Sequence, residues 1–461
     1  MKKIVLLLFT IALSSFLFSQ NTVEGSWLGT LDIQGVKLRL VFNVEQRDGQ
    51  LFSTMDSPDQ GAKDIPVDKT IFNNDSIRFE IPGALIVYKG KLVSENKIEG
   101  QFKQGAYKTS LDLERTEEVP TLNRPQEPKP PYPYASEEVT FKNTSANITL
   151  AGTLTKPEGE GPFACVVMIT GSGPQNRDEE IMGHKPFLVI ADHLTRNGIA
   201  VLRYDDRGTY QSTGDFSYAT TRNLADDVNS AVAYLQTRSD IKQIGLIGHS
   251  EGGVIAPMVA AENKNVDFIV MLAGTGVNGA EILLLQQELI GRAEGFKEKD
   301  LIKNKEANMK IYDIILSSKD ENDAKTKLEK HLKNKKNLPV NSSGISEKLF
   351  VKNIIDTYTN GWMFYFMRLE PSTALEKVSC PVLALNGSKD LQVDAGQNLP
   401  PIKTALEKAG NKDITIKEYP NLNHLFQECE TGAISEYVKI EQTFSPQVLE
   451  DMTNWILKRV E

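Results

Sequence analysis

The 461-residue sequence contains little cysteine and histidine, and it carries no excess of positive charge. Its three cysteines are too few for a disulfide framework, and no Cys-x-x-Cys pair is among them to bind structural zinc. Its five histidines include no His-Glu-x-x-His motif, so we expect no metal centre. The formal net charge is −9, and no Lys and Arg patch is interleaved with aromatic residues. We therefore expect no nucleic-acid partner.

Long apolar runs are also absent, with one exception at the N-terminus. There Lys2 and Lys3 precede an uncharged, mostly apolar stretch, residues 4–18, which polar residues follow. The stretch is shorter than the roughly 20 residues of a membrane-spanning helix. Its charged start and polar end are typical of a secretory signal peptide. We therefore expect residues 1–20 to be removed during export, which leaves a secreted or periplasmic protein without a membrane span.

The rest of the sequence changes in character along its length. Over residues 21–118 apolar and polar residues alternate at period two between glycines, which predicts a small, all-β, barrel-like domain. A proline-rich segment, 119–135, disfavours helix and central strand and is predicted to be a linker. From 136 to 461 apolar strand-like runs alternate with helical ones. This pattern predicts an α/β domain with a mostly parallel sheet covered on both faces.

One block interrupts the alternation of strands and helices. From about 279 to 370 the sequence is rich in Leu, Lys, Glu and Ile at helical spacing and contains no strand-like run. Because the block falls between two predicted core strands, we interpret it as an inserted helical cap. Near its end lies an aromatic cluster that either packs within the cap or forms the apolar wall of a substrate pocket. Trp362 and Phe364 of this cluster are our candidate substrate contacts.

The segment GHSEG at residues 248–252 is the central motif of the sequence. An apolar run leads into it, and a stretch compatible with a helix follows it. A sharp turn from strand to helix that projects a serine needs residues without bulk on either side, and Gly248 and Gly252 supply them. Ser250 is therefore the candidate nucleophile.

A serine hydroxyl needs a general base and a group that orients the base. His424 lies on a predicted loop just beyond the last core strand, whereas the side chain of His249 should point away from Ser250 at the turn. The orienting carboxylate should follow the preceding core strand, at the same end of the sheet. Asp390 meets this requirement, and Asp394 is the alternative.

Stabilisation of a negatively charged oxygen during acyl transfer requires two converging backbone N–H groups. We expect one from Glu251, the residue after the nucleophile, and the other from the loop GSGP at 171–174. In that loop Ser172 is the first choice, with Gly173 as the alternative. The loop continues to Arg177, whose charge either lines the pocket or faces water, and we keep Arg177 as a candidate substrate contact.

Together these motifs resemble the α/β-hydrolase superfamily over residues 136–461. The similarity rests on GHSEG, on LNGSKD at 385–390, on the histidine at 424 and on the order Ser, Asp, His. GSGP and RYDDRG at 203–208 are similar to those of bacterial esterases related to the serine aminopeptidases. The resemblance implies acyl transfer to water through a serine-bound intermediate, without a metal or an organic cofactor. Thr170 departs from the pattern, because many relatives carry a histidine there, and the second N–H donor therefore stays open.

Three functions are compatible with these observations. The first is a secreted serine hydrolase that cleaves small-molecule carboxylic esters, with short acyl groups, through the Ser-His-Asp triad. The second applies the same triad to short peptides, as an aminopeptidase or acyl-peptide hydrolase, with Glu179, Glu180 or Glu370 as the anchor for a substrate amine. The third, of another class, is a surface protein whose β domain binds a ligand and whose hydrolase domain is auxiliary. The sequence does not define the oligomeric state.

Overall fold

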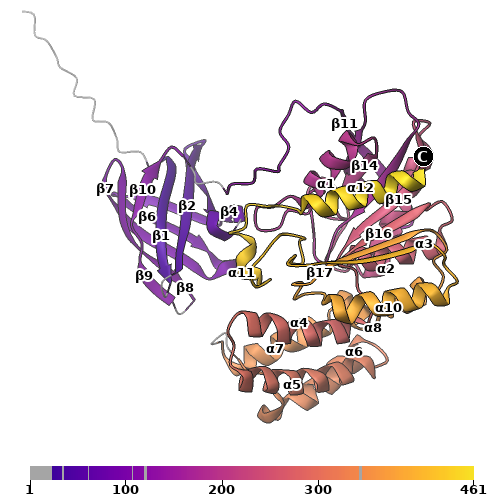
Figure 1. Ribbon diagram of the computed structural model, residues 1–461. Coiled ribbons are helices and arrows are strands. Elements are labelled where there is room, and N and C mark those ends of the chain that lie inside the picture. The colour runs from indigo at the N-terminus through magenta and orange to yellow at the C-terminus, as the bar shows by residue number, and fades with distance from the viewer. Residues whose placement is uncertain are drawn as a thin grey trace, which may run out of the picture. The chain divides into compact units, whose positions relative to one another are not determined.

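A computed structural model describes residues 23–33, 36–60, 62–105, 107–118, 122–341 and 345–460 of the chain (Figure 1). The predicted signal peptide, residues 1–20, lies outside these ranges. The chain divides into two compact units, with the boundary between Leu122 and Asn123.

The first unit is an antiparallel sheet in the order β4-β3-β2-β1-β10-β8-β7-β6-β5, with β9 paired to β8. β5, at one end of this path, approaches β3, the strand next to the other end, since Thr70 Oγ1 on β5 donates to Ser53 Oγ on β3 at 2.9 Å. The sheet is thus barrel-like and nearly closed, as predicted. Its strands are β1 (Gly25–Ile33), β2 (Val36–Arg47), β3 (Gln50–Ser57), β4 (Ala62–Val67), β5 (Lys69–Asn73), β6 (Ser76–Ile81), β7 (Ile86–Ser94), β8 (Lys97–Gln104), β9 (Tyr107–Ser110) and β10 (Leu113–Thr116).

Aromatic side chains fill the interior of this sheet. Successive residues of a strand point to opposite faces, so the period-two pattern turns one apolar set inward. Phe42 and Phe79 stack with ring centroids 4.5 Å apart, and Tyr88 packs beside both rings. Trp27 is fully buried, and its indole N–H donates to the carbonyl of Val23 at 2.7 Å. Large aromatic side chains of this unit therefore form its core.

The second unit is built on a sheet in the order β11-β12-β14-β13-β15-β16-β17-β18. β11 and β12 are antiparallel to their neighbours, and the strands from β14 to β18 along this order are parallel. This confirms the predicted mostly parallel sheet. Its strands are β11 (Ala135–Asn143), β12 (Ile148–Lys156), β13 (Phe163–Ile169), β14 (Ala200–Tyr204), β15 (Ile241–His249), β16 (Phe268–Leu272), β17 (Val382–Gly387) and β18 (Ile414–Tyr419).

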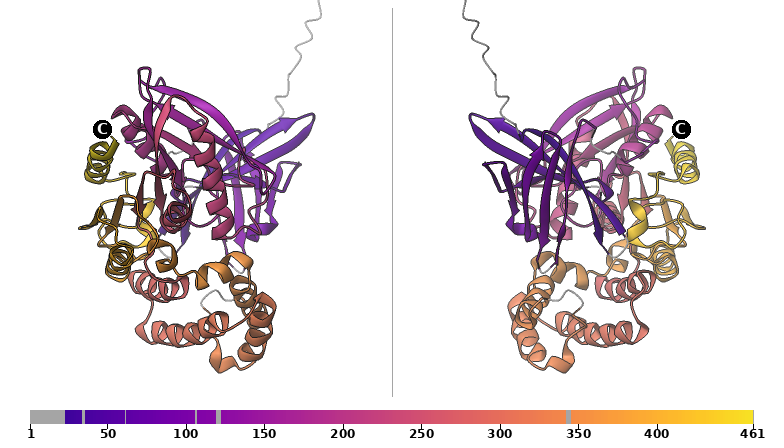
Figure 2. Two further views of the ribbon diagram at one scale, coloured as in Figure 1. Left: turned by 90° about the vertical axis from the view of Figure 1, so that its right-hand side faces the viewer. Right: turned by 90° about the vertical axis from the view of Figure 1, so that its left-hand side faces the viewer.

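Helices cover both faces of this sheet (Figure 2). On β13, Val166 and Met168 pack under α1 (Pro186–Arg196) and α12 (Pro446–Val460), which share one apolar core. The alternate residues Cys165 and Val167 belong to the other core, with α2 (Thr221–Gln236), α3 (Gly252–Glu262) and α10 (Ala395–Lys408). Burial on both faces explains why the strands are almost continuously apolar. The short helices α9 (Ser372–Leu375) and α11 (Ile434–Tyr437) complete the elements at the sheet.

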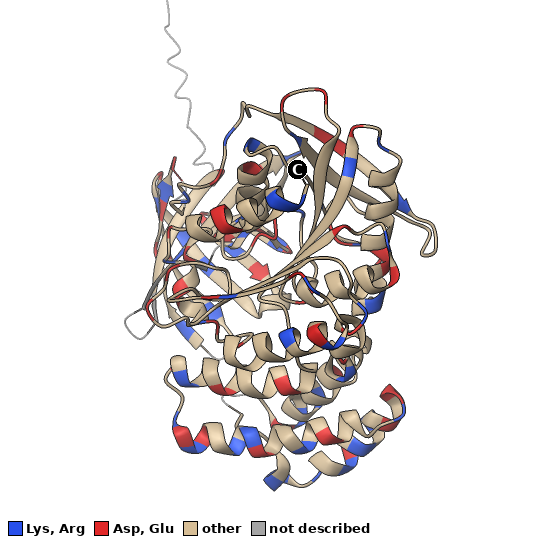
Figure 3. Cartoon of the chain, turned by 45° about the vertical axis from the view of Figure 1, so that its right-hand side comes forward, with Lys and Arg blue, Asp and Glu red and all other residues tan. Residues whose placement is uncertain are grey.

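A helical insertion lies between β16 and β17, as predicted. On its helix α6, Ala324, Leu328 and Leu332 recur every four residues and are buried. Acidic and basic residues are interspersed along the cap helices (Figure 3). Most residues of the lysine-rich sequence at 325–336 are exposed, so this sequence forms a charged surface. The cap consists of α4 (Gly279–Ala293), α5 (Glu298–Leu316), α6 (Glu321–Leu332), α7 (Glu347–Tyr358) and α8 (Gly361–Arg368).

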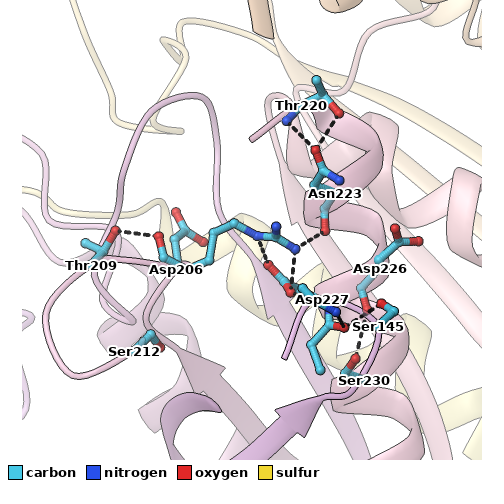
Figure 4. A network of polar contacts seen from close by, with 12 residues as sticks. Ser145, Asp206, Thr209, Ser212, Thr220, Asn223, Asp226, Asp227 and Ser230 are labelled. Atoms are coloured by element: carbon cyan, nitrogen blue, oxygen red, sulfur yellow. Dashed lines mark hydrogen bonds and ion pairs between the residues drawn. The ribbon is translucent and has the colours of Figure 1, made fainter. Parts of the chain in front are cut away.

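A buried ion pair fixes the loop that follows β14 (Figure 4). Arg207 donates from Nε and Nη2 to the two carboxylate oxygens of Asp227 on α2, at 2.7 and 2.8 Å. Arg207 Nη2 also donates to the carbonyl of Asn223, and Asn143 Nδ2 donates to Asp227 at 2.7 Å. These contacts hold the RYDDRG segment, and with it Asp206, against α2.

Candidate active site

The nucleophile turn lies between β15 and α3, and it has the geometry that the glycine spacing predicts. Ser250 has φ +53°, a left-handed conformation that is unfavourable for a residue with a side chain. A Cβ atom on Gly248 would lie 1.9 Å from the carbonyl oxygen of Gly252. A Cβ atom on Gly252 would lie 2.2 Å from the carbonyl oxygen of Ile169. Both positions therefore require glycine, and the tight turn presents Ser250 at the end of the strand.

Asp390 and His424 are brought together by the loops that follow β17 and β18. His424 Nδ1 lies 2.8 Å from Asp390 Oδ2, and both side chains are buried. Asp390 Oδ1 accepts the backbone N–H groups of Gln392 and Val393, each at 2.8 Å. An ionised carboxylate only accepts hydrogen bonds, so we assign the ring proton of His424 to Nδ1, which leaves Nε2 as a proton acceptor.

The alternative carboxylate, Asp394, has a different contact. Asp394 is the N-cap of α10, and its side chain accepts the backbone N–H of Gln397 at 2.7 Å. Such a cap satisfies one of the free N–H groups at the start of a helix. The structure therefore pairs His424 with Asp390 and gives Asp394 a capping contact.

Ser250 and His424 line one cavity of about 290 Å³, at the end of the sheet that faces the cap. Within the described residues no direct hydrogen bond joins the Ser250 hydroxyl to His424. The cap contributes part of the apolar lining, through Ile282, Leu283, Trp362 and Phe366. The cavity thus places a serine, a histidine and an apolar surface around the same space.

Glu251 and Ser172 also line this cavity, whereas Gly173 is not among its lining residues. Among the described residues, neither the Glu251 N–H nor the Ser172 N–H has a hydrogen-bond acceptor. Two unpaired backbone donors beside a serine are what stabilisation of an oxyanion requires. The geometry is therefore compatible with both predicted donors.

Thr170 anchors the start of the loop that contains Ser172. Its hydroxyl donates to Asp206 Oδ1 at 2.9 Å, and the backbone N–H of Gln175 donates to Asp206 Oδ2 at 2.9 Å. The loop that contains Ser172 is therefore anchored at both ends to one buried carboxyl group. This contact gives Thr170 a structural role in the loop.

The side chain of Glu251 joins the nucleophile turn to the cap. It is 1% exposed, accepts the Thr221 hydroxyl at 2.7 Å and accepts Trp362 Nε1 at 2.9 Å. Burial raises the pKa of Glu251, and hydrogen bonds from Thr221, Trp362 and Ser172 oppose this effect. Trp362 therefore lines the cavity and binds the residue that follows the nucleophile.

Phe364 does not line the cavity, which corrects its prediction as a substrate contact. It is buried in the cap core, where the Arg368 guanidinium lies 4.7 Å from its ring centroid. Phe366 lines the cavity instead and stacks on Trp362 at 5.3 Å. Residues four apart share one face of a helix, whereas residues two apart lie on roughly opposite faces. Helical periodicity thus explains why Trp362 pairs with Phe366.

Arg177 also differs from its prediction. Its guanidinium forms ion pairs with Asp205 at 2.8 Å and Glu138 at 2.6 Å, and it is not among the cavity-lining residues. Its backbone N–H donates to Asp205 as well, at 2.9 Å. The structure therefore gives Arg177 a role in fixing the loop after β13, in place of the predicted contact with substrate.

Two cavity-lining residues, Glu179 and His249, have contacts that sequence reasoning missed. Glu179 Oε1 lies 2.9 Å from His249 Nδ1 and accepts the Gly171 N–H at 2.7 Å. His249 Nε2 lies 3.0 Å from the backbone oxygen of His424, and the two rings are 4.7 Å apart. The histidine next to Ser250 was a signal in the sequence, but its partner lies 70 positions away.

No group of three or more His, Cys, Asp or Glu side chains in the described part of the chain is arranged to hold a metal ion. None of the helices in the described ranges has both the length and the apolar character that crossing a membrane requires.

The fold and this cavity define an enzyme of the α/β-hydrolase class. More specifically, the chain belongs to the serine aminopeptidase S33 family, whose model matches residues 185–430. The matched segment includes Ser250, Asp390 and His424 and does not include the loop with Ser172.

Several named proteins are similar to this chain. The chain is 27% identical over 366 residues to esterase EstD of Thermotoga maritima, a match that covers 79% of this chain and 74% of that protein. Est1E from Butyrivibrio proteoclasticus, solved with bound ferulic acid, is 15% identical and covers 70% of this chain and 99% of its own, with a TM-score of 0.40. The Pyrococcus furiosus esterase Pf2001 is 14% identical and covers 71% and 94%, with a TM-score of 0.42.

Proposed function

We propose that the protein is a secreted serine hydrolase that cleaves carboxylic esters with short acyl groups. The observation that carries the proposal is the 2.8 Å contact between His424 and Asp390 at the cavity that Ser250 lines. The similarity to a protein named esterase EstD supports ester substrates. Export is supported by the charged and apolar composition of residues 1–20.

In the first half of the reaction, Ser250 Oγ attacks the carbonyl carbon of the ester. His424 Nε2 takes the hydroxyl proton, and Asp390 orients the ring and stabilises its positive charge. The N–H groups of Glu251 and Ser172 bind the negatively charged oxygen of the tetrahedral intermediate. His424 then gives its proton to the departing alcohol, and an acyl-serine remains.

In the second half, water replaces the alcohol and the same groups act again. His424 removes a proton from the water, which attacks the acyl-serine carbonyl, and then returns a proton to Ser250 Oγ as the carboxylic acid leaves. No other reactant is needed.

The size of the cavity supports short acyl groups. Its volume of about 290 Å³ lies at the lower limit of the roughly 300–1,000 Å³ that is usual for small-molecule sites. Trp362 and Phe366 stack on each other and line the apolar side. We therefore expect acyl groups that fit within this volume to be the better substrates.

The test is a series of nitrophenyl esters of increasing acyl length, measured beside aminoacyl anilides. We expect kcat/KM to fall as the acyl chain lengthens, and Ser250→Ala to lower kcat by about 10⁴-fold or more. Ser217→Ala, which changes an exposed serine, should leave the rates unchanged. Ester hydrolysis that persists in folded Ser250→Ala would refute the triad. The export part is tested by the N-terminal sequence of the protein recovered outside the cytoplasm, which should begin near residue 21.

A second candidate function is cleavage of short peptides, by the same triad. The family description names aminopeptidases, and Glu179 is the one predicted amine anchor that lines the cavity. Glu180 and Glu370 are exposed. Hydrolysis confined to aminoacyl anilides would favour the peptidase over the esterase.

A further inference from the structure

Glu179 and His249 connect three segments that the proposed reaction needs. Glu179 Oε1 accepts the N–H of Gly171, which precedes the Ser172 oxyanion donor, at 2.7 Å. The same oxygen lies 2.9 Å from His249 Nδ1, beside the nucleophile. His249 Nε2 lies 3.0 Å from the backbone oxygen of His424. One carboxylate and one imidazole thus link the oxyanion loop, the nucleophile turn and the loop of the general base.

The protons on the His249 ring can be assigned from its contacts. A carbonyl oxygen only accepts hydrogen bonds, so His249 Nε2 must carry a proton to bind the His424 carbonyl. The contact between Nδ1 and the carboxylate then requires a second proton. Burial lowers the pKa of His249, but the charge and hydrogen bond of Glu179, with the His424 carbonyl and Asp390, raise it above its ordinary value. This favours a positively charged His249 ring, which donates from Nδ1 to the Glu179 carboxylate and from Nε2 to the His424 carbonyl.

Other features of Glu179 are unfavourable for folding. Its residue is 1% exposed, and its second oxygen, Oε2, is buried without a hydrogen-bond partner among the described residues. Its backbone has φ +50°, the left-handed region that residues other than glycine seldom adopt. Buried unpaired oxygens and strained backbone persist mainly where function needs them. Stability alone therefore does not account for a glutamate at this position.

We propose that Glu179 and His249 act as a pair of positioning residues, which hold the Gly171–Ser172 loop and His424 in register with Ser250. This inference rests on the proposed function. Removal of the pair takes one contact from each of two catalytic segments, the Ser172 loop and the His424 loop. A displacement of about 1 Å in such a site costs roughly 100-fold in rate. Because the pair touches no part of the reacting bond, the loss should fall on kcat.

The experiment measures kcat, KM and melting temperature on a short nitrophenyl ester for Glu179→Ala, Glu179→Gln, His249→Gln and the double variant Glu179→Gln/His249→Gln. We expect Glu179→Ala to lower kcat about 100-fold with KM within about threefold. Glu179→Gln should regain at least part of kcat, because its amide oxygen still accepts the Gly171 N–H. The double variant should lose about as much as the worse single variant, as expected for residues that act as one unit. Glu160→Gln makes the same substitution at an exposed site before β13, and it should leave kcat, KM and the melting temperature unchanged.

A melting temperature that stays equal or rises while kcat falls supports positioning, because a merely structural residue would lower both. Full kcat in Glu179→Ala would overturn the proposal, and so would a loss confined to KM, which would place Glu179 in contact with substrate. If Glu179→Ala does not fold, the kcat and KM of Glu179→Gln decide in the same way. Ser250→Ala distinguishes failure of the proposed function from failure of this inference. An active Ser250→Ala variant would refute the proposed function. An inactive Ser250→Ala beside a fully active Glu179→Ala would refute the positioning role alone.

Discussion

Replacement of Asp227 by alanine removes one partner of the buried ion pair that fixes the RYDDRG segment, and so tests how much this pair stabilises the fold. Arg207 is only 8% exposed, and Asp227 accepts two of the three hydrogen bonds that its guanidinium donates in the described structure. In Asp227→Ala the Arg207 guanidinium keeps only the carbonyl of Asn223 as an acceptor. Asn143 Nδ2 also loses the oxygen to which it donates. The variant therefore leaves a buried charge without its counter-charge.

The expected destabilisation is about 3–5 kcal/mol, the usual effect of removing one partner of a buried pair. Unfolding entropy scales with chain length at about 2.1 cal/mol/K per residue near 60 °C. For a unit of the length of Asn123–Glu461, this corresponds to about 1.4 °C per kcal/mol. The melting temperature of this unit should thus fall by roughly 4–7 °C.

Differential scanning calorimetry and urea unfolding at pH 7 measure the effect, with Asp226→Ala as the matched control. Asp226 is adjacent on the same helix, but its ion pair with Arg222 is about one-third exposed, 35% and 36%. Such a pair contributes about 0–1 kcal/mol. Equal destabilisation by the two variants would refute the argument from burial. Arg207→Met/Asp227→Leu should recover most of the loss, because it removes both charges together.

Three further predictions concern the cap, the triad and pH. Trp362→Phe removes a hydrogen bond to buried Glu251, and we expect kcat/KM to fall about tenfold, or 1.4 kcal/mol; an unchanged kcat/KM would show that the indole N–H is dispensable. Asp390→Asn should lower kcat by about 10⁴-fold, whereas Asp394→Asn should keep its cap and its rate, and equal losses in kinetic assays would contradict this pairing. Burial lowers the pKa of His184 to about 4, so neutral His184 stabilises the fold fully above about pH 6.5 and this contribution is lost as the pH falls toward 4. Urea titrations at pH 7.5 and 4.5 should show a loss of about 2.5 kcal/mol that His184→Gln lacks; an identical loss in both proteins would exclude this origin.

The sequence predicts those parts of the fold and site that depend on local pattern. Strands buried on both faces must be apolar throughout, and half-buried strands must alternate, so both sheets are visible as periodicities. The nucleophile turn is visible because close backbone contacts exclude a side chain at Gly248 and Gly252. The pairing of Asp390 with His424 follows from the rule that loops after neighbouring parallel strands lie at one end of the sheet.

The remaining contacts are set by distances that only the folded chain defines. Glu179 meets His249 across 70 positions, and no periodicity connects a loop residue to such a partner. Arg177 was ambiguous because an arginine on a loop can bind substrate or neighbouring carboxylates, and Asp205 and Glu138 become its neighbours only after β12 and β14 pair. The prediction that Trp362 and Phe364 both contact substrate is wrong for Phe364, because residues two apart lie on roughly opposite faces of a helix.

The bond between Trp362 and Glu251 restricts how this enzyme can be redesigned or can diverge. A cap inserted between two strands is a segment that could be exchanged, since it supplies part of the apolar lining of the cavity. Here, however, the module donates a hydrogen bond to a carboxylate buried beside the nucleophile. A foreign cap without a donor at that point would leave this carboxylate short of a partner. Exchange of the cap therefore requires either an equivalent donor or a neutral residue at position 251.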